Sequence, residues 1–200
     1  IAEIGRQGVL LLVSESTDAD SPGHQISETE VQKTIEEIFK VAPGRIIAAT
    51  FASLITRLQQ LIWLSEKYGR KVALEGFSIR QNIAVAQELG YLKIKKGTII
   101  DAKDLHRYKE NEITILCTGA QGEDRAALIR IANNEHRLIS IQPKDSVIFS
   151  SSVIPGNENT VQRLKDTLYK RAGKVYHYAT MDIHSGGHAK QDELTQMIKL

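Results

Sequence analysis

The sequence predicts a doubly wound α/β fold, in which a mostly parallel sheet carries helices on both faces. Short apolar runs rich in β-branched residues alternate with longer segments of helical periodicity. The runs are almost continuously apolar, which is typical of strands buried on both faces of a parallel sheet. Parallel neighbours need crossover connections, and the intervening helices supply them on both faces of the sheet.

Six of these runs are expected to form strands: residues 8–13, 45–50, 71–74, 113–117, 146–150 and 174–178. The first helix is the best marked, because Ser27 and Glu30 form a capping-box pattern and Pro43–Gly44 ends it. Five more helical segments are predicted: from Ser53 to Gly69, from Ser78 to Gly90, over 126–132, from Asn157 to Gly173, and over about 190–200. The charged segment 93–112 is the least regular, and we expect it to be a peripheral excursion.

The composition fits one globular domain of 200 residues, with 42% hydrophobic and 25% charged residues. The formal net charge is only +2, so any site for an anion must be local. The single cysteine, Cys117, excludes an internal disulfide and fits a reducing compartment. No apolar run approaches the roughly 20 residues of a membrane span. The chain has no initiator Met and no leader pattern, and we expect it to be part of a longer protein.

Polar residues follow several predicted strands, at the edge where open parallel sheets bind ligands. Glu15 follows the first run, and partial desolvation at a strand end would raise its pKa, although the sequence favours the other interpretation. The alternative is an ordinary solvated turn. Gly119 and Gly122 precede a helix and could admit an anion, or could simply form a turn. Ser151 and Ser152 could bond a phosphate, or could provide a polar exit from the strand.

The densest group of reactive residues follows the last run: His184, Ser185, Gly186, Gly187 and His188. The glycines permit close backbone approach to an anion, and a histidine can donate to phosphate or act as a general acid. Two histidines do not make a zinc site, so no metal is expected to bind this chain. The other histidines are interpreted as structural or solvated, and Trp63 as a core residue.

Taken in order, several segments of the chain resemble the β-CASP region of ribonuclease J, within the metallo-β-lactamase superfamily. The resemblance covers nearly the whole chain and is most specific in Pro155-Gly156-Asn157-Glu158. The segments are 14–17, 49–53, 69–73, 86–92, 119–123, 150–158 and 184–189.

The resemblance implies that residues 1–200 form a single β-CASP-like domain, inserted in a hydrolase domain that is not in this chain. That domain would hold two zinc ions, and RNA would lie in the cleft between the domains. Glu15 corresponds to the family's first β-CASP acid and His188 to its catalytic histidine. His184, Ser185 and Gly186 would hold RNA phosphate, with Ser151 and Ser152 in support.

The chain departs from the family pattern in two respects. Gly186 occupies the position where the family commonly has serine, and Ser185 lies one place earlier. The family's zinc-binding His-x-His-x-Asp-His sequence is absent, so the isolated chain is expected not to cleave RNA. The implied parent is a cytoplasmic, zinc-dependent exo- or endoribonuclease, and a homodimer of it is possible.

Two other functions stay open on the residues alone. The chain could be a stand-alone Rossmann-like module that binds a small phosphorylated ligand through residues 119–123 and 150–152. It could also be an interaction domain whose turns are only structural, in which case an exposed apolar patch should mark the partner's surface.

Overall fold

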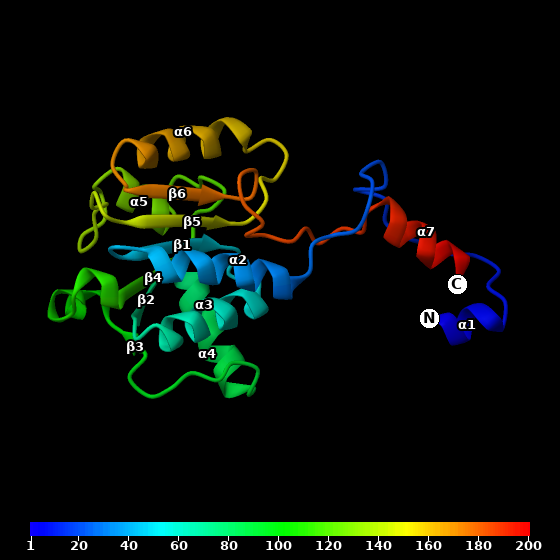
Figure 1. The fold of residues 1–200 in the computed structure, drawn as a ribbon, viewed down its shortest axis with the longest axis horizontal. Helices are drawn as coiled ribbons and strands as arrows, with labels where there is room; N and C mark the ends of the chain where they lie inside the picture. Colours follow the sequence, from blue (N-terminus) through cyan, green and yellow to red (C-terminus); the bar gives the residue numbers. More distant parts are fainter.

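The computed structural model describes residues 1–200 and contains a six-stranded, all-parallel sheet in the order β3-β2-β4-β1-β5-β6 (Figure 1). This confirms the predicted doubly wound α/β fold. The strands are β1 (Ile46–Thr50), β2 (Lys71–Glu75), β3 (Ile99–Ile100), β4 (Ile113–Cys117), β5 (Ser146–Ser150) and β6 (Lys174–His177). The three central strands, β4, β1 and β5, are buried along their whole length, as their continuous apolarity requires.

Helices cover both faces of the sheet. One face packs against α2 (Glu28–Val41), α3 (Ile55–Lys67) and α4 (Phe77–Glu88), and the other against α5 (Ala127–Ala132), α6 (Glu158–Tyr169) and the short 3-10 helix η1 (Ala102–Arg107). A second 3-10 turn, η2 (Glu110–Glu112), leads into β4. The remaining helices, α1 (Ala2–Arg6) and α7 (Gln191–Lys199), stand together away from the sheet (Figure 1). None of the helices combines the length and hydropathy that crossing a membrane requires.

The prediction of a first strand over residues 8–13 is wrong. This segment forms no strand and pairs with none, and Leu10, Leu11 and Val13 are exposed. The sixth strand is instead β3, which lies within the segment expected to be a peripheral excursion. Apolarity alone cannot distinguish a sheet strand from a segment with an apolar surface, because pairing depends on neighbours distant in sequence.

Two details of the helical face also differ from expectation. The α4 helix begins at Phe77, and Ser78 does not cap it, because Gly76 is its N-cap and no side chain bonds there. Trp63 is 43% exposed rather than a core residue, and the Nζ of Lys67 lies 5.0 Å from the centre of its ring. The Lys67 side chain covers part of the Trp63 ring and reduces its contact with water without burying it.

The capping box of α2 is confirmed. The Ser27 hydroxyl accepts the N–H of Glu30 at 3.2 Å, and the Glu30 carboxylate accepts the N–H of Ser27 at 3.1 Å. Glu30 of this cap also lines the cavity that is described with the candidate site below.

Replacing Ser27 with alanine should lower the free energy of unfolding by about 1 kcal/mol, because it removes this cap. Urea denaturation measures the change. Thr34→Ala, at a half-buried position later in the same helix, is the control. Equal stability of Ser27→Ala and the wild type would contradict this account of how α2 begins.

Candidate functional site

The candidate site is built where two segments from opposite ends of the chain run side by side. Asp18 and Lys190 form an isolated parallel bridge, and the N–H of Gln191 donates to the carbonyl of Ser21 at 3.0 Å. Figure 1 shows these two segments leaving the sheet together toward α7. The arrangement brings residues 14–26 against residues 182–190.

Glu15 and His188 meet in this arrangement, 173 positions apart in sequence. The Oε2 of Glu15 lies 3.2 Å from the Nδ1 of His188. The carboxylate also accepts the N–H of Thr17 at 2.9 Å and the N–H of Ala189 at 3.0 Å. The side chains of Glu15 and His188 are 43% and 53% exposed, so the pair is open to solvent.

The backbone N–H groups of Thr17 and Ala189 lower the pKa of Glu15 to about 2. The raised pKa that desolvation would have given is therefore wrong, because Glu15 does not follow a buried strand and these hydrogen bonds outweigh its slight desolvation. At neutral pH its carboxylate is ionised and accepts a hydrogen bond from the Nδ1–H of His188. This assigns the proton of the neutral imidazole to Nδ1, and it leaves Nε2 unbonded within the chain.

His184 has a different environment from His188. Burial, and then the positive charge of Arg57, lower the pKa of His184 to about 4, while Glu28 and the main chain of Ser150 oppose the shift. Its Nδ1 is buried without a hydrogen-bond partner, and its ring lies 6.2 Å from that of Phe51. His184 is therefore a neutral imidazole at neutral pH.

The loop 185–187 packs onto the segment that precedes α2. The Ser185 hydroxyl donates to the carbonyl of Ile26 at 2.7 Å. A Cβ on Gly186 would lie 2.8 Å from the Nε2 of Gln25, whereas Gly187 faces open space. Gln25 in turn donates to the carbonyl of His188 at 2.8 Å. The missing Cβ of Gly186 thus allows the loop to approach Gln25, a residue that the sequence did not single out.

The serines after β5 are organised by another residue that the sequence did not single out. Gln121 is buried; its Nε2 donates to the carbonyl of Ser152 at 2.6 Å, and its Oε1 accepts the N–H of Ile154 at 2.8 Å. Ser151 is buried beside it. A glutamine between two glycines was the only signal in the sequence. Contact of Ser151 and Ser152 with phosphate stays a prediction.

Gly119 and Gly122 have a packing role in the structure. A Cβ on Gly119 would lie 2.8 Å from the Cβ of Ala126, and a Cβ on Gly122 would lie 2.8 Å from the Cγ2 of Thr160. The N–H of Gly122 already donates to the carbonyl of Gly119 at 3.1 Å. These contacts explain both glycines without a ligand, and phosphate binding at this turn stays a prediction.

A cavity of about 650 Å³ lies among the same segments, although neither Glu15 nor His188 lines it. Its lining mixes acids with imidazoles and one lysine: Asp18, His24, Gln25, Ile26, Glu30, Ser152, Tyr178, Asp182, His184, Gly186 and Lys190. No three His, Cys, Asp or Glu side chains gather closely enough to hold a metal ion. The residues of this chain therefore do not fit a zinc centre.

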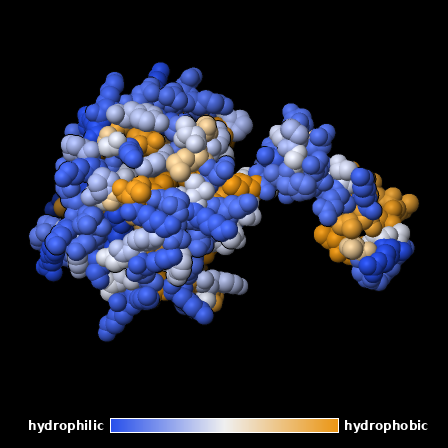
Figure 2. Space-filling view, viewed as in Figure 1, coloured by the Kyte–Doolittle hydropathy of each residue, from blue (hydrophilic) through white to orange (hydrophobic).

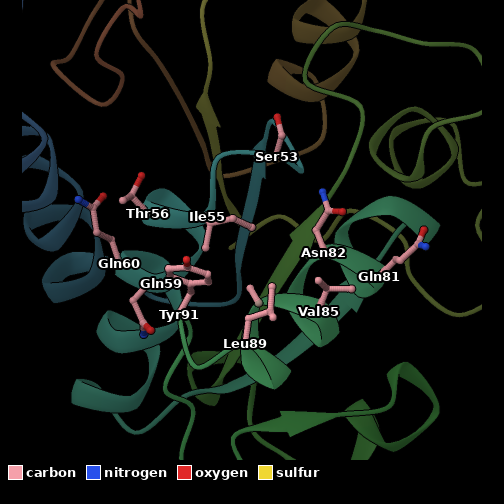
Figure 3. A pocket seen from close by; sticks show the side chains of 11 residues that line it. Ser53, Ile55, Thr56, Gln59, Gln60, Gln81, Asn82, Val85, Leu89 and Tyr91 are labelled. Carbon is pink, nitrogen blue, oxygen red and sulfur yellow. The ribbon is translucent and has the colours of Figure 1, made fainter.

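The largest cavity, about 870 Å³, lies between α3 and α4 and contains none of the predicted site residues (Figure 3). No charged side chain lines it. Both ends of the Gln59 amide bond the main chain of Lys93, and the Nδ2 of Asn82 donates to the carbonyl of Ala52. Since these amides are already satisfied, the groove presents mainly apolar surface and little chemistry.

The chain is an open, parallel α/β domain, a class of fold in which ligands commonly bind beside the carboxyl ends of the strands. The sequence profile "Ribonuclease J, beta-CASP domain" matches residues 43–168. The chain therefore belongs to the ribonuclease J β-CASP domain family.

Curated relatives agree along the whole chain. It is 44% identical to Ribonuclease J of Thermus thermophilus, 45% identical to Ribonuclease J 1 of Streptococcus pyogenes and 42% identical to Ribonuclease J of Helicobacter pylori. All of this chain is covered in each comparison, against 35%, 36% and 29% of the three relatives. The chain thus spans about a third of the length of these relatives.

Replacing His184 with asparagine should reduce the loss of stability at acid pH. The pKa of His184 is about 4 when folded, against an ordinary 6.5, so the unfolded chain binds the proton more tightly. The stability that depends on neutral His184 is complete above pH 6.5 and is lost as the pH falls through 4. Urea denaturation at pH 7 and about pH 5 tests this. His106→Gln, at an exposed position, is the control. An equal loss of stability in wild type and His184→Asn would contradict the assignment.

Proposed function

We propose that this chain is the RNA-contacting domain of a zinc-dependent ribonuclease, in which Glu15 and His188 assist proton transfer. Membership of the ribonuclease J β-CASP family supports the RNA substrate. The single observation that carries the proposed chemistry is the 3.2 Å contact between Glu15 and His188 on an exposed surface.

Hydrolysis of a phosphodiester creates a leaving oxygen that must gain a proton. The Nε2 of His188 is the atom placed to hold and deliver it, since Nδ1 is bonded to Glu15. When Nε2 is protonated, the Glu15 carboxylate stabilises the imidazolium through the Nδ1 bond. The low pKa of Glu15 keeps it an acceptor throughout, so it orients His188 and does not itself carry the proton.

Zinc, when bound to the parent protein, would supply an activated water. Since the residues here do not fit a zinc centre, the ions would be held by a hydrolase-fold domain elsewhere in the same polypeptide. Under this proposal the isolated chain is inactive. The parent protein is proposed to work in the cytoplasm, as a monomer or a homodimer. The lone, buried thiol of Cys117 is compatible with a reducing compartment.

An exposed apolar patch supports a partner domain. Ile1, Ile4, Val9, Leu12 and the end of α7 surround an apolar cavity of about 450 Å³. Figure 2 shows this patch as the main apolar area on the part of the molecule that stands away from the sheet. Apolar surface of this kind marks an interface, and the hydrolase-fold domain is the proposed occupant.

The alternative, a stand-alone module for a small phosphorylated ligand, has less support. It relied on residues 119–123 and 150–152. Gly119 and Gly122 are explained by packing against Ala126 and Thr160, and the carbonyls of Ser150 and Ser152 accept hydrogen bonds from Thr50 and Gln121. No observation in the structure favours it over the ribonuclease proposal.

Replacing His188 with alanine in the full-length protein should lower kcat for RNA cleavage by about 10²- to 10⁴-fold, the range expected for loss of a general acid. Zinc content, measured by atomic emission, should not change, because His188 is not proposed as a ligand. His106→Ala is the matched control. Undiminished cleavage by a zinc-loaded His188→Ala protein would refute the role of this residue.

A further inference from the structure

Arg57 of α3 is completely buried, and each of the three nitrogens of its guanidinium group has an acceptor. Nη1 donates to the Ser150 hydroxyl and, at 2.7 Å, to the carbonyl of Ile183. Nη2 donates to both carboxylate oxygens of Glu28 at 2.9 and 2.8 Å, and Nε donates to the Oε1 of Gln60 at 2.8 Å. One side chain therefore joins α2, α3, the end of β5 and the segment that follows β6.

Ile183 is the residue immediately before the loop that carries the candidate site. Its side chain is buried in the core beneath α2, α3 and α4, and its carbonyl also accepts the hydroxyl of Ser150 at 2.7 Å. The loop 184–188 begins at the next residue. Within this loop, Ser185 and His188 form hydrogen bonds with the segment 15–26 rather than with the sheet.

We propose that Arg57 is a positioning residue of the candidate site: by holding the carbonyl of Ile183 against Ser150, it fixes the loop 184–188 relative to the sheet. This inference rests on the proposed function of that loop. Arg57 itself is buried and touches no substrate, so it acts only through the loop.

The charge of Arg57 gives it a second effect on the same loop. After burial, this guanidinium is the main reason that the pKa of His184 is low, while Glu28 acts in the opposite direction. Asp182 and Lys190 line the same cavity as His184. Loss of the Arg57 charge should therefore raise the pKa of His184 toward its ordinary value.

The structure contains a matched control for this role. Arg45 is also buried and also makes a bidentate pair, at 2.9 and 2.6 Å, with Asp145. Its third bond goes to the carbonyl of Ser140. Arg45 precedes β1 and therefore lies at the opposite edge of the sheet from Ser150 and Ile183. Removing Arg45 leaves the buried carboxylate of Asp145 without its cationic partner, and removing Arg57 takes a donor from the buried Ser150 hydroxyl and Ile183 carbonyl, so both changes destabilise the fold.

The test compares Arg57→Met with Arg45→Met in the full-length protein. Hydrogen–deuterium exchange should become faster over 184–188 only in Arg57→Met, and faster near 140–146 only in Arg45→Met. NMR of ¹³C-labelled histidine should show a raised pKa of His184 only in Arg57→Met. The kcat for RNA cleavage should fall about 100-fold in Arg57→Met, as expected for a misplaced catalytic group, and stay unchanged in Arg45→Met.

Arg57→Lys serves if the methionine variant does not fold, because lysine keeps the charge but lacks the planar fork that reaches Ile183 and Glu28 together. Unchanged exchange over 184–188 in a folded Arg57 variant would overturn the positioning role. Faster exchange over 184–188 with an unchanged kcat would support the positioning role of Arg57. The same result would contradict the proposed function of the loop.

Discussion

The candidate site depends on one constraint: residues 14–26 and 182–190, from opposite ends of the chain, must lie side by side. Gln25 is central to this contact, because its side chain bonds Asp18 and the carbonyl of His188 at 3.0 and 2.8 Å. Its own N–H donates to Glu193 of α7 at 3.2 Å. Without this alignment Glu15 and His188 would be two solvated side chains, since neither is held by the sheet.

The two histidines of the site are kept in different states by different surroundings. His188 is exposed, and its Nδ1 bonds the ionised carboxylate of Glu15. His184 is buried near the cation of Arg57, so it resists protonation. Because His184 stays neutral at neutral pH, the proposed function assigns proton transfer to His188 alone. The sheet contributes through Ser150, which connects Arg57 to the carbonyl before His184.

Much of the fold, and less of the site, could be predicted from the sequence. Continuous local apolarity predicts buried parallel strands such as β1 and β4. The spacing of Ser27 and Glu30 predicts the cap of α2. The segment 8–13 has the same apolarity without a strand partner, so pattern alone misassigned it. The low pKa of Glu15 and the roles of Gln25 and Arg57 arise from contacts between distant segments, which no local pattern encodes.

The central claim is that Glu15 and His188 act as a unit, and a double-mutant cycle on RNA cleavage by the full-length protein tests it most directly. Catalytic groups that act together have strongly non-additive effects on kcat. Glu15→Gln should therefore lower kcat when His188 is present, and should have almost no further effect once His188 is alanine. Two independent effects that simply multiply in the double variant would contradict the claim.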